Sequence, residues 1–123
     1  MDKAVLEQQI GEAMQAHAAW KQKLGDAVKT GRLPKPSCDI RTNDQCSFGK
    51  WLFSLTSDPR VARSAGYQEV MKTHTVFHLE AGRVAELVEK DDLAAAERAL
   101  NGPGYNAATT NLNNAMLQWK QSI

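Results

Sequence analysis

All 3 histidines of this chain, His17, His74 and His78, stand at positions where an apolar helical stripe predicts a core-facing side chain. The segment His74-Thr-Val-Phe-His78 separates two of them by one helical turn, so both imidazoles project from the same helix face. Burying an unpaired polar group is costly, and a shared metal ion is the simplest use for such imidazoles. Cys46, which opens the apolar segment Cys-Ser-Phe-Gly-Lys-Trp-Leu, is the best candidate for a fourth ligand.

Three imidazoles and one thiolate form a His3Cys donor set, which suits Zn²⁺ in charge, softness and tetrahedral geometry. Iron or copper would accept the imidazoles, but nothing in the sequence selects either metal, and a non-haem iron site normally includes a carboxylate. A single core histidine is more often a packing residue than a ligand, and a His-x-x-x-His pair often arises by chance. Here all three histidines lie on core stripes, which favours a ligand role over a packing role. We therefore predict a zinc site.

A catalytic interpretation of the histidine pair fits the sequence less well. A zinc protease of the zincin type carries glutamate directly after the first histidine of its pair, whereas this chain has Thr75 there. Four protein ligands would also leave no open coordination position for a substrate. Nucleophilic catalysis by Cys46 with a histidine base stays open from the residues alone, although no oxyanion-hole or substrate-pocket signal supports it. We expect the protein not to be an enzyme.

Helices must position these side chains, and the first predicted helix, at about residues 3–30, has the cleanest pattern. Its apolar positions follow alternating steps of four and three, as in the seam of a helix bundle, at Leu6, Ile10, Ala13, His17, Trp20, Leu24 and Ala27. Gly31 and Pro34 end the helix. A third histidine on this helix can meet the pair if the two helices are antiparallel neighbours. Residues 31–45 show no periodicity and are expected to form a long structureless connection that ends at Cys46.

The rest of the chain also predicts helices. We expect a short helix at 47–55, then a helix start signal at Asp58-Pro59 and an interruption or kink at Gly66. A long helix should follow at about 67–90. A short alanine-rich helix should run from the Asp91-Asp92 cap through Leu100, and a final helix should carry Tyr105 to Trp119. No segment alternates like a strand, and no repeat is visible. The predicted fold is a single all-α domain over residues 1–123, an antiparallel, four-helix-bundle-like arrangement of three long and two short helices.

Composition limits the partners and the location that we expect. The net charge is +1, which gives no electrostatic case for nucleic acid or an anionic membrane as partner. No apolar run approaches the roughly 20 residues that span a bilayer. The first residues are amphipathic and lack the apolar core of a secretion signal, so we expect a cytoplasmic protein. Two cysteines in that compartment do not indicate a disulfide framework.

The segment from Cys46 to Leu52 resembles the Cys-x-Phe-Gly-x-Trp-Leu signature of the chemoreceptor zinc-binding (CZB) domain family. The resemblance extends upstream to His17 with Trp20, and downstream to the histidine pair, so it covers essentially the whole chain. By motif position it implies the zinc ligands His17, Cys46, His74 and His78. Cys38 matches no part of the signature, and we assign it no metal role.

The resemblance also implies a function. CZB domains are bacterial, cytoplasmic helical bundles, often homodimeric, that occur in soluble chemoreceptors, beside diguanylate cyclase domains, or alone. They regulate chemotaxis or cyclic-di-GMP output in response to zinc or oxidants, notably hypochlorous acid reacting at the zinc-bound cysteine. Nothing in this chain resembles a chemoreceptor signalling hairpin or a cyclase domain, so output requires a partner or a longer parent protein.

Two alternatives to an oxidant switch remain at this point. One is a sensor of zinc availability, in which Cys46 is the gate and no oxidation is needed. The other is a purely structural zinc site in a dimerisation module.

Overall fold

The computed structural model describes residues 3–42 and 47–122, and within those residues every regular element is helical. The prediction of an all-α bundle is confirmed. The elements are α1 (Lys3–Thr30), α2 (Ser37–Arg41), α3 (Ser47–Ser54), the 3-10 turn η1 (Leu55–Ser57), α4 (Pro59–Ala62), α5 (Ala65–Glu89), α6 (Leu93–Leu100) and α7 (Pro103–Ser122).

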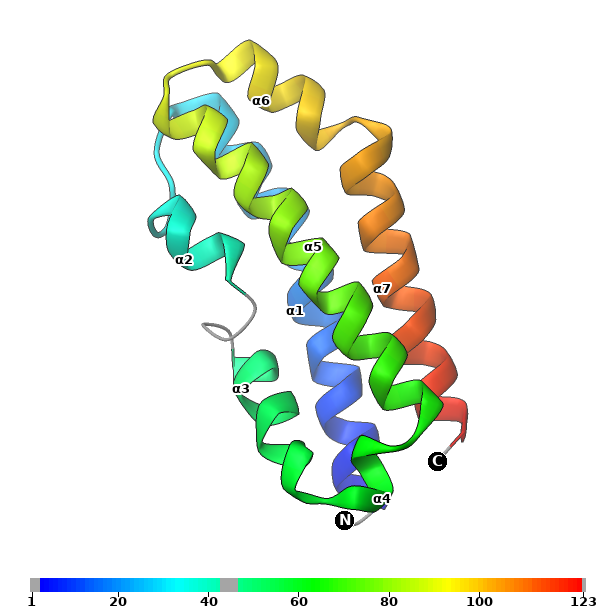
Figure 1. Ribbon diagram of the computed structural model, residues 1–123. Coiled ribbons are helices and arrows are strands. Elements are labelled where there is room, and N and C mark those ends of the chain that lie inside the picture. The colour runs from blue at the N-terminus through cyan, green and yellow to red at the C-terminus, as the bar shows by residue number, and fades with distance from the viewer. Residues whose placement is uncertain (1–2, 43–46, 123) are drawn as a thin grey trace.

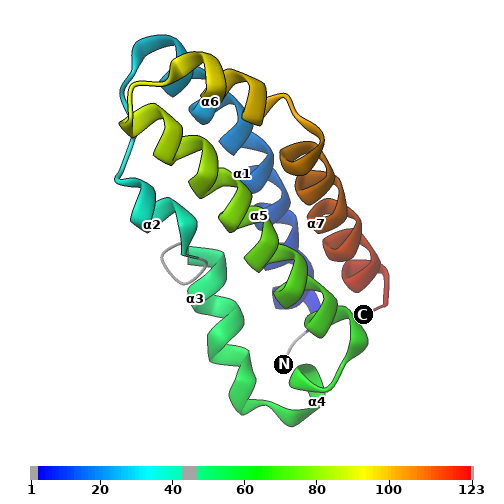
Figure 2. The same cartoon turned by 45° about the horizontal axis from the view of Figure 1, so that its top comes forward.

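The long helices α1, α5 and α7 form three sides of a four-helix bundle. Figure 1 shows α1 and α5 running in the same direction and α7 running back against them. The fourth side is a broken helix, because α2 and α3 lie one after the other along the bundle and return the chain to the end where it began. Figure 2 shows the same arrangement from a second side, with α6 crossing one end and α4 closing the other.

Two local predictions need correction. Residues 31–45 were expected to be structureless, but they contain α2, whose 5 residues are too few to show helical periodicity. Gly66 was expected to interrupt or kink a helix, but it lies in the first turn of α5, which Ser64 caps by accepting a hydrogen bond from the Tyr67 N–H. The described residues therefore hold more than the two short helices that the periodicity predicted.

A different constraint explains the glycine at position 66. A Cβ there would lie 2.6 Å from Cδ1 of the Trp119 indole on α7. Glycine therefore lets the start of α5 and the end of α7 pack closely, which a side chain would prevent.

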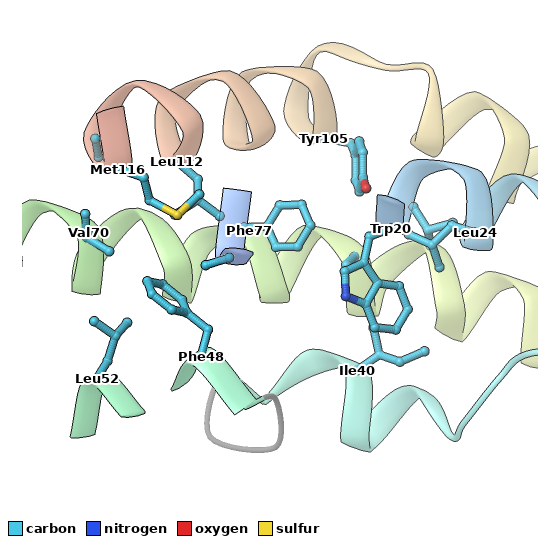
Figure 3. Packing of buried hydrophobic residues seen from close by; sticks show 14 of the residues in the cluster. Trp20, Leu24, Ile40, Phe48, Leu52, Val70, Phe77, Tyr105, Leu112 and Met116 are labelled. Carbon is cyan, nitrogen blue, oxygen red and sulfur yellow. The ribbon is translucent and has the colours of Figure 1, made fainter. Parts of the chain in front are cut away.

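The core runs along the inner faces of the long helices and is covered on the fourth side by α2 and α3. The predicted seam of α1 is confirmed, because all of its members are buried, namely Leu6, Ile10, Ala13, His17, Trp20, Leu24 and Ala27. Figure 3 shows Phe77 of α5 in the middle of this core, Phe48 and Leu52 of α3 and Ile40 of α2 pointing in from one side, and Leu112 and Met116 of α7 on the other.

The cap signals behave as their residue types predict. The Asp58 carboxylate accepts from the Arg60 N–H at 3.1 Å, with proline at the first position of α4. The Asp92 carboxylate accepts from the Ala95 N–H at 3.2 Å and so begins α6. Among the described residues, none of the helices combines the length and hydropathy required to span a membrane.

Candidate metal centre

The three histidines meet in the middle of the bundle. His17 comes from α1, and His74 and His78 come from consecutive turns of α5. Their side chains are 5%, 1% and 2% exposed, so the cluster is shielded from water. The apolar stripes that bury the two helices against each other therefore also bring the imidazoles together.

The Nε2 atoms of the three rings converge. His74 Nε2 lies 3.1 Å from His17 Nε2 and 3.0 Å from His78 Nε2, and the candidate ligand atoms all lie within 4.8 Å of one another. A tetrahedral zinc ion with bonds of 2.0–2.1 Å would separate two nitrogen ligands by about 3.3 Å. The spacing of the three donors therefore fits a single metal ion of zinc's size.

Hydrogen bonds on the far side of two rings determine which nitrogen faces the cluster. His17 Nδ1 lies 2.7 Å from the Ala13 carbonyl oxygen, and His78 Nδ1 lies 2.8 Å from the Ile40 carbonyl oxygen. A carbonyl oxygen only accepts, so each Nδ1 carries the proton and each Nε2 presents a lone pair. If His74 Nε2 carried a proton, it could donate a good hydrogen bond to only one of the other two Nε2 atoms. A metal ion instead accepts the lone pairs of all three Nε2 atoms.

Burial keeps the imidazoles neutral. Desolvation lowers the pKa of His17 to about 4 and, reinforced by the neighbouring histidines, that of His74 to about 2. Desolvation also lowers the pKa of His78. At neutral pH the cluster therefore offers unprotonated nitrogen donors, which is the form that binds metal.

These pKa values predict acid lability of the metal-free protein. Below about pH 6.5 the unfolded chain binds protons at its histidines, whereas the pKa of folded His17, about 4, keeps that ring neutral. The free energy of unfolding should therefore fall as the pH drops from about 6.5 toward 4, by about 1.4 kcal/mol per pH unit for each such histidine. Urea unfolding of chelator-treated protein between pH 7.5 and 5 measures this slope.

The control for this prediction is His74→Gln, which removes one titrating ring and should give a shallower slope than the wild-type chain. A wild-type free energy of unfolding that stays constant between pH 7 and 5 would contradict the prediction.

Two phenylalanines wall the cluster. The Phe48 ring meets His74 edge to face at 5.3 Å between centroids and His17 at 5.7 Å. Phe77 makes the same kind of contact with His17 at 5.2 Å and with His78 at 5.5 Å. These rings fix the imidazole planes and exclude water from the site.

The predicted fourth ligand, Cys46, lies outside the described residues, so its role stays a prediction. Two residues further along the chain, Phe48 of α3 contacts the histidine cluster. Cys38 is an exposed free thiol on α2, and the metal-binding group found among the described residues does not include it.

The structure corrects one expectation and adds one residue to the site. The histidines were expected to come from antiparallel neighbours, but α1 and α5 run in the same direction because the α2–α3 segment returns the chain between them (Figure 1). The Ile40 carbonyl, which holds His78, was missed altogether. A backbone acceptor leaves no signal in residue type, and its helix was too short to show a period.

Comparison with known protein families matches residues 17–85 to the chemoreceptor zinc-binding domain, CZB. The chain belongs to the CZB domain family. The matched span is more than half of the chain, though narrower than the resemblance drawn from the motif, and it includes all four predicted ligands. No curated protein and no solved structure matches the chain. With its buried histidine cluster, this CZB domain is a zinc-binding domain of the chemoreceptor type.

Proposed function

We propose that this CZB domain is a cytoplasmic sensory domain in which His17, Cys46, His74 and His78 bind Zn²⁺, and in which Cys46 is a redox switch for hypochlorous acid and related oxidants. The observation that carries the zinc site is the convergence of three buried Nε2 atoms, with separations of 3.0 and 3.1 Å around His74. The carbonyl partners of His17 and His78 support it, because they keep two of those atoms free of protons.

The switch chemistry follows from thiolate reactivity. A bound zinc ion keeps a cysteine ligand deprotonated at neutral pH, and the thiolate is the form that oxidants attack. When hypochlorous acid oxidises the Cys46 thiolate, sulfur gives up an electron pair, chlorine leaves as chloride, and the hydroxyl oxygen bonds to sulfur as a sulfenic acid. Because a sulfenic acid is a much weaker donor than a thiolate, oxidation would remove one ligand from the site.

Cys46 is the ligand that we expect to leave. The three imidazoles are buried on the two long helices α1 and α5, so their release would require the bundle itself to open. Cys46 instead belongs to the segment that joins two short helices. Helices this short do not form by themselves, so we expect the segment between them to open at a lower free energy than the core helices.

The helix that follows Cys46 connects the site to the end of the bundle. On α3, Phe48 stacks on Trp51 at 5.7 Å between centroids, and Trp51 lies 6.0 Å from Trp119 near the end of α7. The Tyr67 hydroxyl of α5 donates to the Leu52 carbonyl at 2.7 Å. A shift of α3 would therefore change the packing of α5 and α7. Two packing states whose free energies differ by a few kcal/mol are enough to carry a signal.

Methionines near the site compete for the oxidant. A cavity of about 310 Å³ is lined by His17 and Phe77 together with Met14 of α1 and Met116 of α7. Thioethers are also oxidised, to sulfoxides. Any test of the switch must therefore identify which sulfur reacts first.

Output requires a second domain. We propose that the domain works as a homodimer and passes its signal to a chemoreceptor signalling domain or a diguanylate cyclase domain, in the same polypeptide or in a partner, so that it regulates chemotaxis or cyclic-di-GMP levels. Neither nucleic acid nor a membrane is proposed as partner, and no enzymatic activity is proposed.

Hypochlorous acid should release zinc from the wild-type domain and oxidise Cys46 in the same range of doses, because loss of the thiolate removes one of four ligands. A chromophoric zinc indicator follows the release, and mass spectrometry of the digested protein locates the oxidised sulfur. The matched control is Cys38→Ala, which removes an exposed thiol outside the site and should release zinc as the wild type does.

Three results would contradict the oxidant switch. Oxidation of Cys38, Met14 or Met116 before Cys46 would place the reactive sulfur elsewhere. A Cys46→Ala variant that stays folded and binds zinc more weakly, together with wild-type zinc that oxidants do not release, would instead indicate a sensor of zinc availability. Unfolding of the Cys46→Ala variant would indicate a structural zinc site.

A further inference from the structure

The short helix α2 packs against one face of α5, directly beyond the histidine cluster. Ile40 of α2 is 1% exposed and accepts the hydrogen bond from His78. Four α5 residues that approach α2 are spaced by helical turns, at His78, Gly82, Glu86 and Glu89. The face of α5 that carries a predicted ligand is therefore also the docking face for α2.

Gly82 allows α2 to approach this closely. A Cβ at position 82 would lie 2.5 Å from the Cβ of Arg41 and 2.8 Å from its Cα. Because a backbone atom is among those contacts, rotation of a side chain could not relieve the overlap. Gly82 lies one helical turn after His78, and Arg41 directly follows Ile40. Any side chain at 82 would therefore push the Ile40 carbonyl away from the His78 ring.

Two glutamates of α5 hold the ends of α2. The Glu89 carboxylate accepts from the Ser37 N–H at 3.0 Å and from the Ser37 hydroxyl, and these bonds keep the pKa of Glu89 below its ordinary value. At the other end, Arg41 donates to Glu86 at 2.6 Å. Exposed ion pairs of this kind contribute little to stability, so their effect is to fix the position of α2 along α5.

We propose that Gly82 and Glu89 are positioning residues for the zinc site, which act through the Ile40 carbonyl. By holding α2 on α5 they keep the proton on His78 Nδ1 and direct His78 Nε2 at the other two imidazoles. Zinc binding itself belongs to the proposed function, on which this inference rests. The position of α2 determines the tautomer of His78 even without metal.

The experiment measures the ring tautomer of His78 and the affinity for zinc in the same proteins. Nitrogen-15 NMR of the metal-free protein at pH 7.5 reports which ring nitrogen carries the proton, and competition with a chelator gives the zinc affinity. In Gly82→Ala we expect the signature of a protonated, carbonyl-bonded Nδ1 to be lost at His78 and kept at His17. Zinc affinity should fall by about 10- to 100-fold, as when other hydrogen-bond partners of metal ligands are removed.

Glu89→Ala is the second variant, and because Glu89 is exposed it should fold even if Gly82→Ala does not. It should change the tautomer and the affinity in the same direction, by less. Matched controls are Gly25→Ala, whose Cβ would make only an ordinary contact at 3.9 Å with Leu100, and Glu69→Ala, which removes a carboxylate of α5 distant from α2. Both controls should bind zinc like the wild type.

The outcomes separate this inference from the proposed function. A wild-type protein that binds no zinc would overturn the zinc site, and the His78 tautomer in the metal-free variants would then decide the role of α2 by itself. If the wild-type protein binds zinc but the His78 tautomer is unchanged in both Gly82→Ala and Glu89→Ala, only the positioning role is overturned. A changed tautomer with unchanged zinc affinity, or a loss of affinity equal to that in the controls, would also overturn it.

Discussion

Replacing His74 with alanine is expected to abolish zinc binding at the site and, with it, the stabilisation that zinc confers. His74 Nε2 lies within 3.1 Å of the corresponding atoms of both other histidines, so its loss removes the central donor of the cluster. Structural zinc contributes on the order of 10 kcal/mol in small domains, which is comparable to the whole free energy of unfolding. Chelator competition and thermal unfolding with and without zinc measure the two effects.

The matched control is Val70→Ala, on the same helix and one turn earlier. Val70 is fully buried and carries no donor atom, so its truncation should cost about 2 kcal/mol through lost packing and leave zinc affinity unchanged. If His74→Ala kept wild-type zinc affinity, or if zinc raised the unfolding temperature of both variants equally, the assignment of the site to these histidines would be wrong.

Phe77→Ala should destabilise the metal-free protein by about 3–5 kcal/mol, the usual cost of truncating a buried phenylalanine. Phe77 is 0% exposed and lies at the centre of the core (Figure 3). Its ring also packs edge-on against His17 and His78, so the cavity left behind would let both imidazoles reorient. A weaker affinity for zinc should therefore accompany the loss of stability. Urea unfolding of metal-free protein measures the first effect, and chelator competition the second.

Phe53→Ala provides the comparison, because Phe53 on α3 is 42% exposed. Removal of an exposed ring should change the free energy of unfolding by no more than about 0.5 kcal/mol. Similar costs for the two variants would mean that the core is not organised around Phe77 as described.

The spacing of residue types along the sequence was sufficient to predict the long helices, their buried faces and the family of this protein. The buried faces of α1 and α5 could be predicted from residue types at helical spacing. A long helix that packs on a core needs apolar side chains at every turn of one face, and this repeat is visible in the sequence. The three histidines lie on those stripes, so their presence in the core could be predicted without knowing how the helices pack. The motif around Cys46 indicated the family, which the match over residues 17–85 confirms.

Only the tertiary structure decided how the histidines meet and what holds them. The apolar repeat within each helix does not show that α1 and α5 run in the same direction. Their relative direction depends on the α2–α3 segment, which returns the chain to the end where α1 began. The 5 residues of α2 are too few to form a stable helix by themselves, so α2 forms through its contacts with α5. The bond from His78 to the Ile40 carbonyl joins residues 38 positions apart. A backbone oxygen is present at every residue, so only the fold can select which one a histidine meets.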